Sequence, residues 1–175
     1  MRKRERDDEF SVFVRTATPE LLRIAWFLTG DVEDAKELVQ ASLTKTYAAW
    51  SRVRPGLAMP YTRTVMVNHR NDTWRKRHRE VLVDPHSGQE QDGVDPGRPR
   101  AALADHIAAQ QDLIDALATL PPQQRRVVVL RHYCDLSEAT VAQELGISLG
   151  AVKSTSARGL ANLRKHYAHT KETVR

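Results

Sequence analysis

A short stretch in the last third of the chain gathers side chains that suit contacts to a polyanion. Within about two helical turns it presents two cations and two hydroxyls, Lys153, Ser154, Thr155 and Arg158. Lysine and arginine bind phosphates or guanine edges, and serine and threonine suit either backbone or base contacts. No acidic residue occurs from Leu145 to Tyr167. The stretch therefore has the chemistry of a helix that contacts DNA.

The residues around this stretch, from Leu136 to Ser154, have the spacing of a helix-turn-helix. Ala142 is small where two helices must approach closely, and Gly146 can adopt the left-handed conformation of the turn. Ser148 is placed to cap the second helix, which we expect to run to about Lys165. Apolar residues stand where the pair needs a shared core, at Val141, Leu145, Ile147 and Val152. A helical hairpin with a solvated basic face is the alternative interpretation.

A second basic cluster directly follows Trp74 and consists of Arg75, Lys76, Arg77 and Arg79. Asn68 and Arg70 precede it by a turn or so. Basic residues beside an exposed aromatic ring suit opened or single-stranded DNA. The alternative is structural, because cations also stabilise helix C-termini and Trp74 could belong to the core.

Helical periodicity predicts the elements that carry these clusters. An apolar stripe begins at Leu21 and Gly30 closes its helix. Asp31 opens a second helix, which has acids in its first turn and ends near Trp50. Pro60 suits the first turn of a third helix that ends at about Arg79.

The periodic pattern breaks from Val81 to about Arg100, where proline, glycine and polar residues accumulate as in a flexible linker. Beyond it, apolar periodicity resumes at Ile107, and Pro121 and Pro122 mark a turn and a new helix. The run 127–130 is rich in β-branched residues and could form a strand. The prolines before it and the absence of a partner strand favour a buried helix.

We therefore expect an all-α protein with two small helical domains joined by a flexible linker. The first domain, the linker and the second domain are expected at 1–80, 81–104 and 105–175. Hydrophobic residues at 41% and charged residues at 28% are typical of a globular chain. The formal net charge of +5 favours a nucleic-acid partner.

Cysteine usage and the N-terminus indicate the compartment. Cys134 is the only cysteine, so an intrachain disulfide and a cysteine-rich zinc site are excluded. The charged N-terminus is followed by no apolar segment of signal-peptide length, and no run approaches a membrane span. We expect a cytoplasmic protein that does not insert into a membrane and holds no metal or other cofactor.

Taken together, these segments resemble the extracytoplasmic-function sigma factors, particularly the actinobacterial sigma-E family. The similarity spans nearly the whole chain and rests on the order and spacing of its pieces. Residues 34–40 resemble the core-polymerase-binding stretch, usually written with two acids where this chain has Lys36 and Glu37, and 46–50 continue it. Residues 120–131 and 150–154 are similar to the C-terminal signature.

The resemblance implies binding to core RNA polymerase, followed by promoter recognition, melting and transcription initiation. The helix that carries Asp34, Glu37, Leu38 and Gln40 is expected to dock on the clamp helices of the β′ subunit, and the β subunit is a further expected partner. Acids in a first helical turn are also explained without a partner. Inhibition by an anti-sigma protein is common in the resembling family, although no residue here identifies one.

The resemblance also assigns promoter DNA, melted and double-stranded, to the two basic clusters. At the melted minus-ten element an unstacked base sits in a pocket while cations hold phosphates; the expected contacts are Arg52, Arg54, Asn68, Arg70, Trp74, Arg75 and Arg77. At the minus-thirty-five element a helix enters the major groove, and the expected contacts are Ser148, Lys153, Ser154, Thr155 and Arg158. Many family members carry arginine where this chain has Thr155, so we expect a shorter contact there. The linker would thread toward the polymerase cleft or act as a passive tether.

Two other classes of protein fit the sequence less well. One is a DNA-binding regulator that never joins polymerase, because helix-turn-helix domains with this spacing also end many response regulators. The receiver domain of such a protein has alternating strands and helices, and none appears before Gly93. An enzyme is disfavoured because the chain has no Walker-type phosphate loop, no His-Glu-x-x-His helix and no convincing nucleophile pair. We therefore expect neither catalysis nor a small-molecule substrate.

Overall fold

The computed structural model describes residues 3–54, 56–81 and 101–173, with side chains from 4 to 69 except 55 and from 110 to 169. Seven α-helices run through these residues: α1 (Lys3–Thr29), α2 (Val32–Ala49), α3 (Ala58–Val81), α4 (Ala101–Ala118), α5 (Pro122–Val128), α6 (Glu138–Leu145) and α7 (Leu149–Thr173). A 3₁₀ turn, η1 (Trp50–Arg52), follows α2, and a π-helical turn, η2 (Val129–Tyr133), follows α5. No strand occurs in the part of the chain that is described, so the expected all-α class is confirmed.

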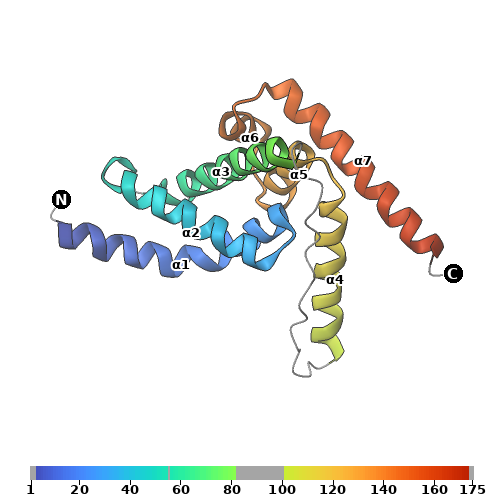
Figure 1. Cartoon of the computed structure of the whole chain (residues 1–175), viewed down its shortest axis with the longest axis horizontal. Helices are drawn as coiled ribbons and strands as arrows, with labels where there is room; N and C mark the ends of the chain where they lie inside the picture. Colours follow the sequence, from blue (N-terminus) through green and yellow to red (C-terminus); the bar gives the residue numbers. More distant parts are fainter. Residues whose placement is uncertain (1–2, 55, 82–100, 174–175) are drawn as a thin grey trace.

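The first three helices pack side by side into one unit, in which α2 contacts both α1 and α3 (Figure 1). The expected boundary between α1 and α2 is confirmed: Gly30 has φ +81°, and the Asp31 side chain accepts a hydrogen bond of 2.8 Å from the Asp34 amide. A left-handed glycine followed by an N-cap makes a tight corner. This corner turns α2 back along α1.

The helix α1 begins much earlier than its apolar stripe predicts and continues through Pro19. Aromatic packing holds the additional turns, because the rings of Phe10 and Phe13 lie 5.0 and 5.2 Å from the ring of Trp50. At the same end, the Tyr47 hydroxyl donates to the Asp7 carboxylate over 2.6 Å. Tertiary contacts therefore outweigh the cost of a proline inside the helix.

The helices α4 to α7 form the second unit, and the apolar run 127–130 lies buried inside it. This run is helical, as the prolines before it predicted, and α5 passes directly into the π-turn η2. Gly159 of α7 permits this packing, because a Cβ at its position would lie 2.6 Å from Val128 Cγ2. The close approach of α5 and α7 therefore depends on a residue without a side chain.

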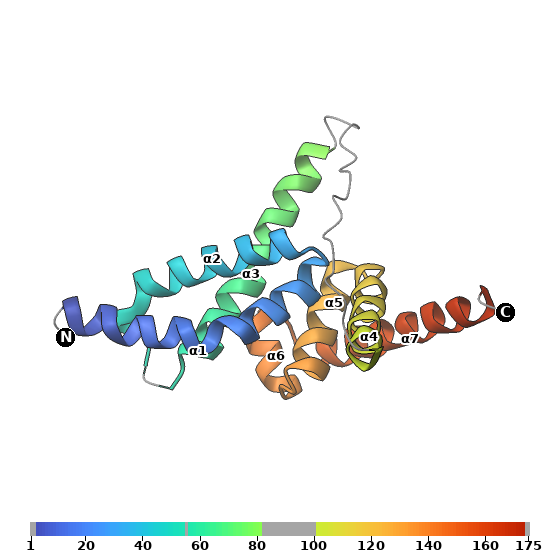
Figure 2. The same cartoon turned by 90° about the horizontal axis from the view of Figure 1, so that it is seen from below.

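The two units pack against each other (Figures 1 and 2). Their buried residues form one continuous core. The Phe27 and Tyr133 rings meet edge to face at 4.5 Å, and Arg125 Nη1 donates to the Leu28 carbonyl over 3.0 Å. The last turns of α3 project from this body in Figure 2. Residues 82–100, most of the expected linker, lie outside the described residues, and α4 starts at Ala101. None of the described helices is both long enough and apolar enough to cross a bilayer.

Candidate nucleic-acid interface

The predicted helix-turn-helix is formed by α6 and the start of α7. Ser137 caps α6 by accepting a hydrogen bond of 3.1 Å from the Thr140 amide, and Gly146 ends the helix with φ +63°. Ser148 accepts a hydrogen bond of 3.2 Å from the Ala151 amide and caps α7 as expected. Capping and the glycine turn thus set the ends of both helices through local backbone chemistry.

The helix α7 divides its first turns between a buried and an exposed face. Val152, Thr155 and Gly159 are buried, whereas Lys153, Ser154 and Arg158 are exposed. Thr155 is only 5% exposed, so its hydroxyl cannot reach a base edge while the domain is folded as observed. The expectation that Thr155 contacts DNA is therefore corrected: this residue packs α7 onto its own domain.

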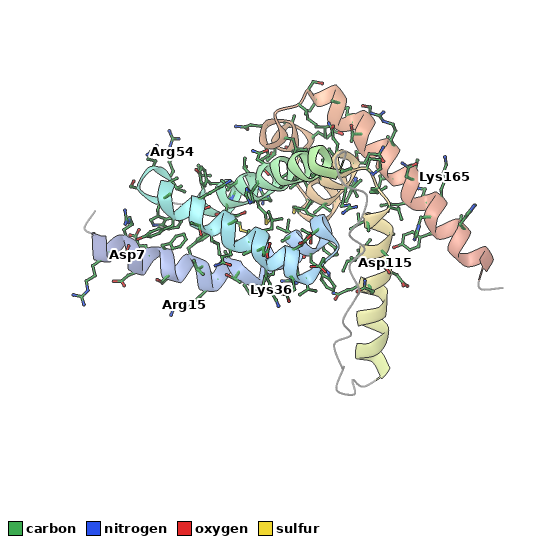
Figure 3. The ribbon with its side chains drawn as sticks, viewed as in Figure 1. Asp7, Arg15, Lys36, Arg54, Asp115 and Lys165 are labelled. Carbon is green, nitrogen blue, oxygen red and sulfur yellow. The ribbon has the colours of Figure 1, made fainter. Side chains whose placement is uncertain are left out.

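The exposed face of α7 keeps the other expected contacts together and adds an apolar one. Lys153 Nζ lies 3.7 Å from the Glu138 carboxylate of α6, and Arg158 Nε donates to the Ser154 carbonyl over 3.2 Å. Leu149, in the first turn, is 45% exposed. Sequence reasoning missed Leu149, although an apolar residue beside the cap can contact a thymine methyl. Lys165 extends this face outward along α7 (Figure 3).

A cleft of about 660 Å³ lies between the turn beyond α2, the start of α3 and the outer side of α6. Arg52, Arg54 and Tyr61 line it from the first unit, and Thr140 and Gln143 line it from the second. Arg54 points away from the body at the tip of the turn (Figure 3). The volume is within the range of sites that enclose one small ligand or base.

The cleft contains an aromatic residue that the sequence argument overlooked. Tyr61 is 38% exposed, so its ring offers a stacking surface to a base. Asn68, two turns further along α3, is exposed as expected. The side chains of Arg70, Trp74, Arg75 and Arg77 lie outside the described residues, although their backbone belongs to α3. The sequence did offer a signal, because Tyr61 is an aromatic residue directly after Pro60 in the expected first turn of this helix.

An apolar groove of about 520 Å³ runs between α1 and α2. Phe10, Val14, Leu22, Val39 and Leu43 are among its lining residues. Such a groove between two helices suits the apolar face of a partner helix.

Polar side chains of α2 border this groove and carry part of the expected polymerase site. Gln40 and Lys36 line the groove, Glu37 is exposed beside it, and Asp34 is half-buried. Leu38 is only 6% exposed and belongs to the core of the chain. The expectation that Leu38 seats on the polymerase is corrected, because its neighbours in the first unit already cover it.

An ion pair between the two units was not foreseen from the sequence. Arg63 of α3 donates to both carboxylate oxygens of Glu144 of α6, over 3.2 Å from Nε and 2.7 Å from Nη2. The two residues are 6% and 8% exposed. Burial works to lower the pKa of Arg63, but the hydrogen bonds and the charge of Glu144 outweigh it and raise that pKa. The guanidinium therefore stays charged where it is buried.

The exposed side chains of these surfaces are of types that bind nucleic acid. Cationic side chains gather in two places, on the exposed face of α7 in the helix-turn-helix and beside the base-sized cleft. Among the described residues, no group of three His, Cys, Asp or Glu side chains is arranged to hold a metal ion.

Known proteins share both units of the fold. Residues 13–80 match the family Sigma-70 region 2, and residues 110–163 match the family Sigma-70, region 4. The chain is 39% identical to the RNA polymerase sigma-E factor of Streptomyces coelicolor, over 90% of this chain and 85% of that protein. It is 30% identical to the ECF RNA polymerase sigma factor SigE of Mycolicibacterium smegmatis, over 92% of this chain and 63% of that protein.

A solved structure gives the same result. The sigma factor RpoE of Bartonella quintana, determined in complex with the anti-sigma factor NepR, superimposes with a TM-score of 0.71 at 25% identity. The match covers 90% of this chain and 95% of that chain. The chain belongs to the extracytoplasmic-function RNA polymerase sigma factors, in the sigma-E group. Its function is promoter recognition and transcription initiation through RNA polymerase.

Proposed function

We propose that this sigma factor divides its work between the two units, residues 1–80 and 105–175. The first unit docks on core polymerase and holds the melted minus-ten element, and the second places α7 in the major groove of the minus-thirty-five element. The observation that carries the proposal is that the cations lie on different units: Arg52 and Arg54 of the first unit line the cleft, whereas Lys153 and Arg158 lie on the exposed face of α7 in the second.

The polymerase contact is assigned to α2 and to the groove between α1 and α2. Its occupant is the helical clamp of the β′ subunit, because an apolar groove lined by Val14, Leu22 and Leu43 accepts a helix. Glu37 and Gln40, at or beside the rim, supply polar contacts that fix orientation. Asp34 contributes at the start of the helix.

A charge reversal at the rim tests this assignment. Because Glu37 is exposed, Glu37→Lys should leave the fold intact and weaken binding to core polymerase by about tenfold, the effect of one rim contact of about 1.4 kcal/mol. Asp115→Lys on α4 is the matched control, since Asp115 is also exposed and lies far from the groove (Figure 3). Affinity is measured by titrating labelled protein with purified core polymerase. Equal affinities for the two variants would refute the docking assignment.

Promoter DNA is assigned to two sets of described residues. Arg52, Arg54, Tyr61 and Asn68 are the contacts that line or adjoin the minus-ten cleft, with Arg70, Trp74, Arg75 and Arg77 expected further along α3. Ser148, Lys153, Ser154 and Arg158 are the contacts to the minus-thirty-five element. Cations hold phosphates in both places, and Tyr61 stacks on an unpaired base.

The test is reconstitution with core polymerase. The mixture should elute as one complex in gel filtration, retain a subset of genomic fragments and start transcription from them. Mutating either promoter element of a retained fragment should abolish the transcript. A protein that binds these fragments alone and never elutes with polymerase would be a regulator of another class.

An anti-sigma partner is supported by the likeness to RpoE, which was solved with such a protein. We expect the chain in its own cells to occur partly in a one-to-one complex without polymerase. Recovery of the chain only as free protein or as holoenzyme, before and after stress, would contradict this expectation.

A further inference from the structure

We propose that Arg63 is a further promoter-DNA-binding residue, which the Glu144 carboxylate masks while the two units are packed together. Its partner in the open protein is a backbone phosphate of the melted strand. The inference rests on the proposed function, because it adds a contact to the minus-ten surface.

The geometry of the ion pair is one that a phosphate can reproduce. Arg63 binds Glu144 through two parallel hydrogen bonds of 3.2 and 2.7 Å. The planar guanidinium fork binds carboxylate and phosphate oxygens in the same bidentate manner. Glu144 is also the only acid among the described residues that line the cleft. The other charged side chains that line it are the cations Arg52 and Arg54. A carboxylate therefore stands beside the surface where the DNA strand is expected.

The position of Arg63 on α3 places it at the edge of this cleft. Its neighbours in the chain, Tyr61 and Thr64, both line the cleft, and Glu144, its partner, lines the opposite wall. Glu144 is 81 residues away in the chain and belongs to the other unit. Separation of the units removes this carboxylate and leaves the guanidinium beside the base-binding surface.

Separation of the units costs less free energy when a phosphate replaces Glu144 than when Arg63 is left without an anion. Removing one partner from a buried ion pair leaves an uncompensated charge, which is far more costly than replacing that partner by another anion. A phosphate that takes the place of Glu144 keeps Arg63 paired throughout. DNA thus lowers the cost of opening, and the closed form resists opening in its absence.

Three variants of the full chain separate a DNA contact from a merely structural ion pair. Glu144→Gln removes the masking charge, Arg63→Gln removes the cation, and the double exchange Arg63→Glu with Glu144→Arg restores a pair with reversed polarity. Circular dichroism checks that each variant folds. The probe is a fluorescent single strand carrying the minus-ten element of a promoter retained by the wild-type holoenzyme.

The lone cysteine reports whether the units are packed. Cys134 follows η2, and burial raises the pKa of its thiol to about 11, with Arg63, Glu20 and Glu144 as the charges that act on it. At pH 8 roughly 0.1% of this thiol is ionised, so the closed protein reacts slowly with thiol reagents. Opening moves Cys134 away from the first unit and accelerates its labelling.

We expect Glu144→Gln to bind the strand about three to ten times more tightly as free protein and to label faster at Cys134, because the competing carboxylate is gone. Arg63→Gln also labels faster but, in holoenzyme, binds the strand about tenfold more weakly, with the slope of log affinity against log salt reduced by about one. The double exchange should label like the wild type and still bind DNA weakly in holoenzyme.

A purely structural pair gives the opposite pattern. The double exchange would then bind the strand as wild-type protein does, and this result overturns the inference whatever the single variants do. Unchanged strand affinity in Glu144→Gln overturns the masking role. If wild-type holoenzyme itself retains no promoter, the proposed function fails instead, so the two failures are distinguishable.

Discussion

At the residue scale, burial decides which polar side chains of a helix remain available for a partner. Thr155 and Lys153 lie only two positions apart on α7, yet the first is buried and the second is exposed. Helical periodicity predicts that they face different directions, but the helix-turn-helix spacing alone did not say which of them faces DNA. Leu38 shows the same ambiguity on α2. Residue type identified these candidates, and tertiary packing selected among them.

Arg158 provides the sharpest residue-scale test of DNA reading. Its guanidinium is exposed on the face of α7 that also carries Lys153 and Ser154. Arg158→Ala should lower affinity for minus-thirty-five duplex by about fivefold to a hundredfold, the usual effect of removing one base or phosphate interaction of about 1–3 kcal/mol. Binding is measured by fluorescence anisotropy at several salt concentrations. Arg15→Ala on α1, another exposed arginine far from α7 (Figure 3), should bind as wild type.

The salt dependence shows whether Arg158 binds a phosphate or a base. If its partner is a phosphate, Arg158→Ala reduces the salt slope by about one and weakens all duplexes alike. If its partner is a base edge, the substitution relaxes the sequence preference at one position. Loss of affinity in both arginine variants by the same factor would indicate a general charge effect and contradict the placement of α7.

At the scale of elements, local chemistry predicted the boundaries well. Gly30, Asp31, Gly146 and Ser148 each occupy the cap or turn position that their side chains favour, because capping is decided within a few residues of the chain. The early start of α1 escaped prediction. It depends on the contacts of Phe10 and Phe13 with Trp50, which lies about 40 residues further along the chain. The first turns of α1 are rich in charged residues and Pro19 disfavours a helix interior, so the local sequence did not indicate these contacts.

Gly159 tests how closely α5 and α7 must pack. A methyl group at this position would lie 2.6 Å from Val128 Cγ2, so Gly159→Ala should destabilise the protein by about 1–3 kcal/mol, the usual cost of overpacking a core. Gly150→Ala is the matched control on the same helix, since nothing lies within 4 Å of its Cβ position. The control should be neutral or more stable by up to about 1 kcal/mol, because alanine favours the helix. Chemical denaturation measures both; equal stability would contradict the close approach.

At the scale of the whole molecule, the sequence indicated two helical units but not their mutual packing. Each unit has its own apolar periodicity, which is a local property that sequence reveals. The contacts between the units join Phe27 to Tyr133 and Arg63 to Glu144, and no spacing rule connects residues about a hundred positions apart. The cleft was missed for the same reason, since one of its walls comes from α6. Residue type alone could not indicate which of the 22 acidic residues forms the ion pair with Arg63.

Arg125 of α5 joins the ends of two other helices and should control how firmly the units hold together. Its guanidinium donates to the Leu28 carbonyl in the last turn of α1 over 3.0 Å and to the Ala118 carbonyl at the end of α4 over 2.6 Å. Carbonyls in a last helical turn lack helical partners and carry partial negative charge, so a cation between two such ends satisfies both. The residue itself lies in α5, and the bridge therefore spans both units.

Arg125→Lys keeps the charge but loses the planar fork that reaches two carbonyls at once. We expect faster thiol labelling of Cys134 and loss of amide protection at the ends of α1 and α4, with helical content retained, because the units separate before either unfolds. Gln123→Ala, an exposed neighbour in the first turn of α5, is the control and should match the wild type. Loss of helical signal in step with the labelling would instead show that the two units fold as one cooperative body, so that opening and unfolding are the same event.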